Sequence, residues 1–135
     1  MVKSRTLLSI IELGGYPDFC ELYEKCGYQV ESVSSMRKAI RSLKQNIPSV
    51  IVAEFNFQSD FRDRTSNLET LMAAMQQIQV QQIQQQQESD IKLIIFYEKE
   101  YLHQFEKLRQ RFKFHAELAY PIDTDVLSSA LKAES

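Results

Sequence analysis

Side chains that could take part in chemistry lie at or just after the ends of four short apolar runs in this sequence. The residues concerned are Glu12, Glu54, Tyr97 and Tyr120. A carboxylate can ligate a cation or move a proton, whereas a tyrosine is neutral at pH 7 and offers a hydroxyl group without positive charge. What this set can do depends on the elements that position it.

No other pattern in the sequence supports an enzyme. A nucleophile elbow for a Ser-His-Asp arrangement is missing, and three glycines are too few for a phosphate-cradling dinucleotide loop. His103 and His115 are not spaced as metal ligands relative to Cys20 and Cys26, which we expect to be reduced packing residues. We therefore predict a protein without catalytic activity and without a firmly bound cofactor.

Length and composition predict one domain over residues 1–135. The chain has a mass of 15.8 kDa, with 44% hydrophobic and 25% charged residues, which are globular values. Its formal net charge of −2 gives no basic excess, so we expect no nucleic-acid partner. No apolar run approaches the roughly 20 residues of a membrane helix, and residues 1–5 lead into no secretory-signal pattern. Reduced cysteines favour a cytoplasmic protein with no membrane partner.

Short apolar runs bounded by turn residues predict five strands. They lie at Thr6–Ile11, Tyr28–Ser32, Val50–Phe55, Lys92–Tyr97 and Ala116–Tyr120. Two of these runs are nearly continuous, as is typical of strands buried on both faces of a parallel sheet. Helical spacing of apolar residues predicts a helix after each strand. The helices are expected to begin near Pro17, Ser35, Asn67, Glu100 and Thr124, where the Ser, Asn and Thr residues are candidate N-caps.

Strands that alternate with helices pair in parallel through right-handed crossovers. Five such units predict an α/β protein with a flavodoxin-like (βα)5 three-layer sandwich and a parallel five-stranded sheet of order 2-1-3-4-5. Ligand sites in this architecture lie beyond the carboxyl ends of the strands. The four residues that could do chemistry stand at those ends, so we expect the fold to bring them to one edge.

The segments at the strand ends resemble the response-regulator receiver family, the CheY-like domains, over essentially the whole chain. Residues 27–30 are similar to the family's turn into the second strand, and residues 48–53 to its third strand, which ends on the aspartate that receives phosphate. Residues 91–97 are similar to the fourth strand, which ends on Thr or Ser. Residues 119–121 are similar to the end of the fifth strand, where the family has Lys-Pro.

The resemblance implies signal transduction in a two-component system or phosphorelay, but the positions that phosphotransfer needs are altered. Glu12 stands where the family has an acidic pair that holds magnesium, so Glu12 and Glu54 together leave at most weak Mg²⁺ binding. Glu54 replaces the acceptor aspartate, and its extra methylene moves the carboxylate about 1.5 Å outward. We interpret Glu54 either as a built-in mimic of the phosphorylated state or as a solvated carboxylate at a strand end.

Tyrosines occupy the two other receiver positions. Tyr97 takes the Thr/Ser position, and Tyr120 takes the lysine position, where it cannot replace an ammonium group. We expect both rings to lie over the crevice, and Tyr120-Pro121 to keep the cis peptide that the family's Lys-Pro pair often shows. The sequence thus indicates a degenerate receiver, or pseudo-receiver, that is not phosphorylated. The alternative is a receiver-like domain that still binds a metal or small anion at the strand-end crevice.

A glutamine-rich segment is the second departure from the family. Residues 76–87 contain nine glutamines, interrupted by Ile78, Val80 and Ile83. Because glutamine is a good helix former, we predict that the third helix extends over about residues 76–88. The extension is either a solvated low-complexity segment or an arm that pairs with another helix through the three apolar residues.

Several aromatic residues are candidates for contact with a partner. Phe57 and Phe61, in the loop after the third strand, either anchor a partner or fold back over the altered pocket. The resemblance points to a contact face around the fourth helix, the fifth strand and the fifth helix, with Tyr101, Phe105 and Glu117. The partner we expect is a protein, either a signalling protein or a second copy of the chain in a homodimer.

Overall fold

The computed structural model describes residues 5–11, 19–55, 67–84, 91–111 and 114–132. Strands and helices alternate along these residues, as expected for a (βα)5 chain. The strands are β1 (Arg5–Ile10), β2 (Tyr28–Val33), β3 (Val50–Glu54), β4 (Lys92–Tyr97) and β5 (Ala116–Ala119). The helices are α1 (Cys20–Lys25), α2 (Met36–Gln45), α3 (Asn67–Gln84), α4 (Leu102–Arg109) and α5 (Thr124–Lys132).

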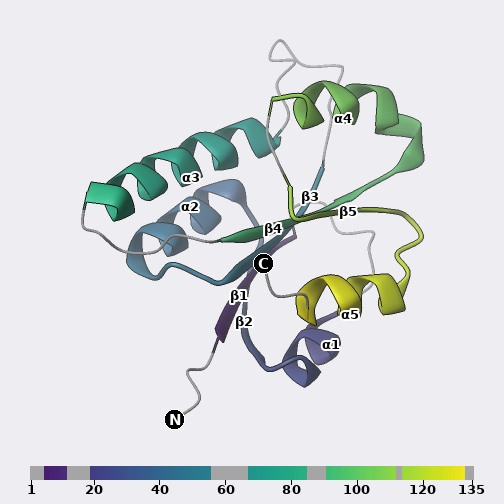
Figure 1. The fold of residues 1–135 in the computed structure, drawn as a ribbon, viewed down its shortest axis with the longest axis horizontal. Coiled ribbons are helices and arrows are strands. Elements are labelled where there is room, and N and C mark those ends of the chain that lie inside the picture. Colours follow the sequence, from purple (N-terminus) through teal and green to yellow (C-terminus); the bar gives the residue numbers. More distant parts are fainter. Residues whose placement is uncertain (1–4, 12–18, 56–66, 85–90, 112–113, 133–135) are drawn as a thin grey trace.

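The strands form one parallel sheet in the order β2-β1-β3-β4-β5, which confirms the predicted topology. β3 lies at the centre, between β1 and β4, and all of its residues are buried. Helices α2, α3 and α4 lie on one side of the sheet, and α1 and α5 lie on the other (Figure 1). Right-handed crossovers that run in opposite directions along a sheet lie on opposite faces, so the reversal of direction after β2 places α1 opposite α2, α3 and α4.

Two hydrophobic clusters, one on each face of the sheet, make the core. Alternate residues of each strand point to opposite faces, so Ile51 and Ala53 of β3 join the cluster beneath α2, α3 and α4. Val50 and Val52 join the cluster beneath α1 and α5. This alternation decides which face each strand-end side chain approaches.

At α2 and α5, the side chain of the residue before the helix accepts hydrogen bonds from the first turn and so acts as the N-cap. The hydroxyl of Ser35 accepts a hydrogen bond from the Lys38 backbone N–H at 3.2 Å, as predicted for the start of α2. The cap predicted at Thr124 is wrong by one residue. Asp123 is the cap of α5, because its carboxylate accepts from the backbone N–H groups of Asp125 at 2.9 Å and Val126 at 3.4 Å. Both residues are good caps, and only the turn geometry distinguishes them.

A 3-10 turn at Lys99–Tyr101 precedes α4. The helix predicted from Glu100 to Phe112 is therefore shorter, and α4 spans Leu102–Arg109. Its buried residues, Phe105 and Leu108, are one helical turn apart and face the core. Short stretches of 3-10 geometry are common at helix ends.

Helix α3 runs from the core into the glutamine-rich segment. Its buried residues Leu71, Met72, Met75 and Ile78 contact the core, whereas Val80 is 55% exposed. The helix continues to Gln84, and the remaining predicted extension lies outside the described residues. Among the described helices, none is both long enough and apolar enough to cross a membrane.

Candidate functional site

Backbone hydrogen bonds hold the carboxyl ends of the strands together at one edge of the sheet. The N–H of Phe55 donates to Phe96 O at 2.7 Å, and the N–H of Tyr120 donates to Tyr97 O at 2.8 Å. At the other side, Ile11 N–H donates to a β2 carbonyl at 2.9 Å. These bonds fix Glu54, Tyr97 and Tyr120 at neighbouring strand ends, as the topology predicts.

Glu54 is the last residue of β3, and it is only 4% exposed. In the sheet register it lies opposite Phe96 of β4. It shares the strand alternation of Val50 and Val52, so its side chain leaves the sheet on the α1–α5 face. The interpretation of Glu54 as a solvated carboxylate is wrong, because neighbouring groups shield this side chain from solvent. A buried carboxylate is costly unless polar groups compensate for lost hydration.

Aromatic rings fill the space beside Glu54 on that face. Phe19, the residue before α1, packs edge-on against Phe96 with ring centroids 5.8 Å apart and planes inclined by 78°. Phe19 also contacts Tyr23 of α1, at 6.5 Å between centroids. Such tilted pairs are favourable arrangements of aromatic rings. The α1 side of the strand-end edge is therefore lined by apolar rings.

Tyr97, at the end of β4, approaches the opposite face. Its half-buried ring packs against the cluster beneath α2, α3 and α4 and stacks on Phe105, with centroids 4.7 Å apart. The prediction that this ring lies over the crevice is wrong, because the ring belongs to the packing of α4. Glu54 and Tyr97 stand at adjacent strand ends, but their side chains leave the sheet on opposite faces.

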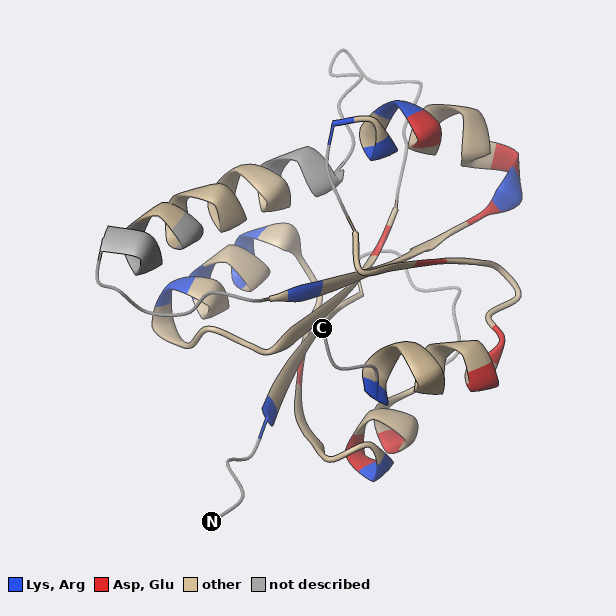
Figure 2. Cartoon of the chain, in the orientation of Figure 1, with Lys and Arg blue, Asp and Glu red and all other residues tan. Residues whose placement is uncertain are grey.

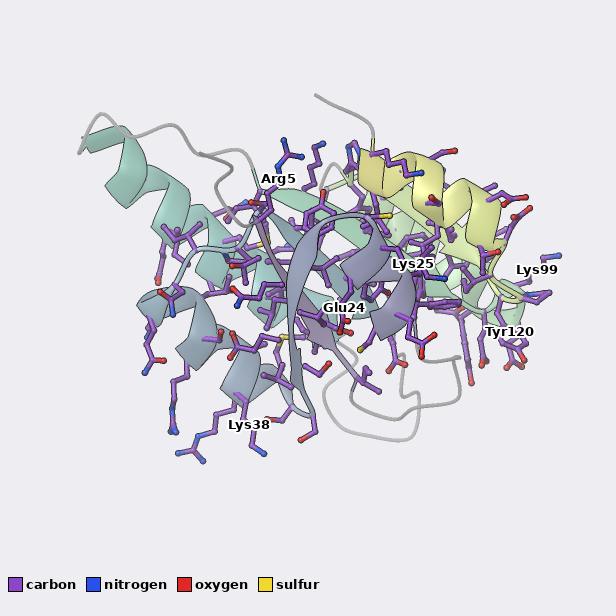
Figure 3. The ribbon with its side chains drawn as sticks, turned by 90° about the horizontal axis from the view of Figure 1, so that it is seen from below. Arg5, Glu24, Lys25, Lys38, Lys99 and Tyr120 are labelled. Carbon is purple, nitrogen blue, oxygen red and sulfur yellow. The ribbon has the colours of Figure 1, made fainter. Side chains whose placement is uncertain are left out.

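Tyr120 lies at the end of β5 and is 45% exposed. The peptide bond between Tyr120 and Pro121 is cis, as predicted. Figure 3 shows Tyr120 and Lys99 at the same end of the molecule. Tyrosine supplies no ammonium group at this position, and Lys99 is an exposed residue of the 3-10 turn rather than part of the sheet.

An acidic pair follows β4 that the sequence analysis did not identify. A side-chain hydrogen bond with Glu100 raises the pKa of Glu98, and burial and the negative charge of Glu100 raise it further. The signal was visible in the sequence as two glutamates, two residues apart, directly after an apolar run. These carboxylates add negative charge to the strand-end edge, which disfavours an anion such as phosphate.

The remaining sequence candidates fall into three groups. Glu12, Phe57 and Phe61 lie outside the described residues, as does the side chain of Ile83 within α3. Ile78 and Phe105 are buried, at 8% and 0% exposure, so their side chains serve the core and not an exposed contact surface. Tyr101 is half-buried and packs against the same core cluster.

On the face formed by α4 and β5, one of the residues predicted to contact a partner is already in an ion pair within the chain. Arg109 Nη2 lies 2.9 Å from one carboxylate oxygen of Glu117, and its Nε donates to the other at 3.1 Å. The same guanidinium lies 5.9 Å from the centroid of the Phe105 ring. Glu117 is thus engaged within the chain, in the two-point geometry that arginine favours.

The described residues contain no cluster of side chains that would ligate a metal ion. Within the described ranges, no group of three or more His, Cys, Asp or Glu side chains is arranged to hold a metal ion. Glu54 is one of the two carboxylates of the predicted weak Mg²⁺ site, and Glu12 lies outside those ranges. The pairing of Glu12 and Glu54 therefore stays a prediction.

Solved structures supply the family comparison. No protein-family model matches the sequence, and no curated protein matches it. A response regulator receiver domain protein from Clostridium thermocellum is similar over 94% of this chain and 90% of its own, with 17% identity and a TM-score of 0.63. The chain has the receiver fold. Chemotaxis protein CheY4 from Vibrio cholerae is similar over 96% of this chain and 98% of its own, with 14% identity and a TM-score of 0.64.

A DNA-binding response regulator of the LuxR family from Staphylococcus aureus has the same receiver fold. It covers 94% of this chain and 95% of its own, at 15% identity and a TM-score of 0.63. At such low identity, the likeness concerns the path of the backbone. Within the receiver fold of this chain, the third strand ends on Glu54, the fourth on Tyr97, and Tyr120 follows the fifth.

Proposed function

We propose that this chain is a receiver-like signalling module that works by protein–protein contact and does not accept a phosphoryl group. The observation that carries the proposal is the burial of Glu54 at the end of β3, with 4% of its surface exposed. In-line attack on phosphorus needs an accessible carboxylate placed to within a fraction of an ångström. A buried and longer side chain meets neither condition.

The surroundings of Glu54 support the same proposal. Transfer of a phosphoryl group requires positive charge near the oxygens that gain electron density. Tyr120 supplies no cation at the end of β5, and Glu98 and Glu100 add negative charge after β4. The Tyr97 ring stacks on Phe105, on the other face of the sheet, and so does not lie beside Glu54. We infer that the domain keeps one conformation and signals through a protein partner in the cytoplasm, as a non-enzymatic component of a two-component pathway.

Incubation with acetyl phosphate and Mg²⁺, followed by intact mass spectrometry, tests the proposal. We expect no gain of mass, whereas a phosphorylatable receiver treated in parallel gains about 80 Da for one phosphoryl group. An adduct of that mass on this chain, mapped to Glu54 or a neighbouring carboxylate, would refute the proposal. A Glu54→Gln variant shows whether any adduct belongs to this position.

The alternative function, binding of Mg²⁺ or a small anion at the strand ends, has its own test. A ligand that binds only the folded protein raises the melting temperature as its concentration exceeds Kd. Thermal unfolding with millimolar Mg²⁺, alone and with phosphate, should leave the melting temperature unchanged if the chain works by protein contact alone. A rise that Glu54→Gln abolishes would support the alternative.

A further inference from the structure

The exposed face of α2 carries four cations, and the carboxylate of Glu31 on β2 contacts the helix by accepting a hydrogen bond from the Ser42 hydroxyl at 2.8 Å rather than by an ion pair. Arg37, Lys38, Arg41 and Lys44 are all exposed, and the helix contains no aspartate or glutamate. Figure 2 shows basic residues alone among the charges of α2, whereas α1 and α5 carry both signs. Arg37, Arg41 and Lys44 follow i, i+4, i+7 spacing and therefore lie along one side of the helix. We call these three residues the α2 stripe.

The positive charges of α2 lower the stability of the helix itself. Like charges three and four residues apart repel each other, which applies to Arg37 with Arg41 and to Arg41 with Lys44. Arg37 and Lys38 also occupy the first turn, where the positive end of the helix dipole disfavours cations. Departures from such local rules concentrate at functional sites. The α2 stripe is therefore better explained by a partner than by the stability of the domain.

The α2 cations have no acidic partner among the described residues. Lys38 Nζ donates to the hydroxyl of Ser34 at 3.4 Å, which leaves its charge uncompensated. The ion pair of Arg109 with Glu117 lies on another part of the surface. In Figure 3, Lys38 projects from α2 away from the sheet. The cationic groups are thus presented to solvent and to whatever binds there.

Exposed apolar residues occur toward the carboxyl ends of α2 and α3. α3 packs beside α2, and the two helices run in the same direction (Figure 1). Ile47, which follows α2, is 45% exposed, and Val80, near the end of α3, is 55% exposed. Both lie toward the end of the helix pair where Lys44 stands. A partner helix that follows the α2 stripe past Lys44 can also bury exposed apolar side chains, and burial of apolar surface adds to the affinity of the contact.

The distribution of charge favours a protein partner over a nucleic acid. The whole chain has a formal net charge of −2, and Asn67–Gln84 of the neighbouring α3 contains no basic residue. Among the described helices, α2 alone carries basic residues without acidic ones, whereas nucleic-acid-binding domains usually carry a broad basic surface. A single row of cations at helical spacing matches a row of carboxylates at the same spacing on another helix.

We propose that the α2 stripe, with Ile47 and Val80 at its end, is the docking surface for an acidic amphipathic helix of a protein partner. This inference rests on the proposed function, because it names the surface through which the contact is made. It does not rest on the absence of phosphorylation, so either proposal can fail alone. The surface lies on α2 and α3, away from the face of α4 and β5 that the sequence analysis singled out.

Fluorescence anisotropy with defined probes tests this docking surface. The acidic probe is a labelled helical peptide of about 20 residues, long enough to hold a helix, with glutamates at i, i+4, i+7 along one side and leucines beside them. The second peptide carries glutamines in place of the glutamates. A labelled DNA duplex is the third probe. All are measured with the intact chain at about 0.05 M and about 0.3 M salt, because screening weakens exposed charge pairs.

Two matched variants locate the contact. The stripe variant is Arg37→Gln, Arg41→Gln, Lys44→Gln, and glutamine keeps the helix propensity of α2. The control variant is Lys25→Gln, Lys99→Gln, Lys107→Gln, which removes the same number of exposed cations elsewhere. Circular dichroism and thermal unfolding establish that both variants are folded.

The expected result is binding of the acidic peptide by the parent and the control variant. The stripe variant should bind it at least about tenfold more weakly, as expected when several charged contacts are lost. Val80→Gln should also weaken binding of the acidic peptide. Equal affinity of the stripe and control variants would overturn the proposal, as would failure of the parent to bind the acidic peptide.

Two further outcomes would assign the surface to another occupant and so overturn the proposal. The first is tighter binding of the DNA duplex than of the acidic peptide. The second is self-association in sedimentation experiments that the stripe variant abolishes. The phosphorylation experiment measures the mass of the protein, and the docking experiments measure its affinity for peptides. A failure of the proposed function can therefore be distinguished from a failure of the docking proposal.

Discussion

The Tyr97 ring stacks on the Phe105 ring, with centroids 4.7 Å apart and planes inclined by 26°. Phe105 also contacts Phe114, with centroids 5.7 Å apart and planes inclined by 13°, and Phe55, with centroids 5.1 Å apart and planes inclined by 52°. Phe105 is 0% exposed. These contacts attach α4 to the ends of β3 and β4, and they take Tyr97 away from the strand-end crevice.

Truncation of the central ring tests how much this cluster stabilises the domain. Phe105→Ala removes a buried ring and its aromatic contacts, so we expect the free energy of unfolding to fall by about 3–5 kcal/mol. Urea denaturation followed by circular dichroism measures the change. His103→Ala, at an exposed position of the same helix, should change stability by less than about 0.5 kcal/mol. A loss below about 1 kcal/mol for Phe105→Ala would contradict the central role of this ring.

The cap of α5 offers a test at adjacent residues. Asp123→Ala removes the carboxylate that accepts the hydrogen bonds from Asp125 and Val126, so we expect a loss of about 0.5–2 kcal/mol. Thr124→Ala changes the first helical residue and should have a smaller effect. Thermal unfolding of both variants measures the difference. A larger effect at Thr124 would show that the cap predicted from the sequence, and not Asp123, begins the helix.

The acidic pair after β4 predicts a pH dependence of stability. The pKa of Glu98 is raised by the hydrogen bond with Glu100, by burial and by the charge of Glu100, so the folded protein binds this proton more tightly than the unfolded chain does. The stability that this carboxyl contributes is fully present below the ordinary carboxyl pKa. It is lost as the pH rises through the raised pKa.

Glu98→Gln removes this dependence. We expect the variant to be more stable than the parent at pH 7 and to match it in acid below the carboxyl range. The gain should be less than about 1 kcal/mol, because solvent screens a pair near the surface. Glu100→Gln removes the repelling charge and should give a gain of the same sign. Unfolding measured from pH 3 to pH 8 would disprove the assignment if the difference from the parent did not grow with pH.

Partial restoration of receiver chemistry tests why phosphoryl transfer is absent. Glu54→Asp shortens the carboxylate, but the end of β5 still lacks a cation, so we expect no adduct with acetyl phosphate and Mg²⁺. Glu54→Asp with Tyr120→Lys supplies an ammonium group at the same edge, and we expect a fraction of the protein to gain about 80 Da. Equal modification of the single and double variants would show that the missing cation is not what prevents transfer.

The topology of the sheet could be predicted because the sequence patterns that indicate its strands and helices are local. Val50–Glu54 and Lys92–Tyr97 are nearly continuous apolar segments, and each is bounded by polar or turn residues. Alternation of such segments with amphipathic helices restricts the order of strands to few arrangements. The bounds of the strands in the structure differ from the predicted ones by at most one residue at each end.

The orientation of the strand-end side chains was predicted less well, because it depends on packing between distant segments. Glu54 was placed at the correct end of β3, but its burial depends on tertiary packing around that strand end, which the local sequence pattern does not specify. The position of the Tyr97 ring depends on how α4 approaches the sheet, which the sequence pattern of either element does not specify. The α2 stripe was readable from its sequence, but its meaning required knowledge that all of its cations are exposed.

Helix α3 continues beyond the last of its described side chains that contacts the core. Ile78 is the final described side chain of the helix that is buried, and Val80 points into solvent. Glutamines added to or removed from the end of this helix would therefore leave the described core contacts of α3 unchanged. Each added residue would lengthen the helix by about 1.5 Å and turn its end by about 100°. The tract would then act as an adjustable spacer whose length natural variation can change while the sheet stays the same.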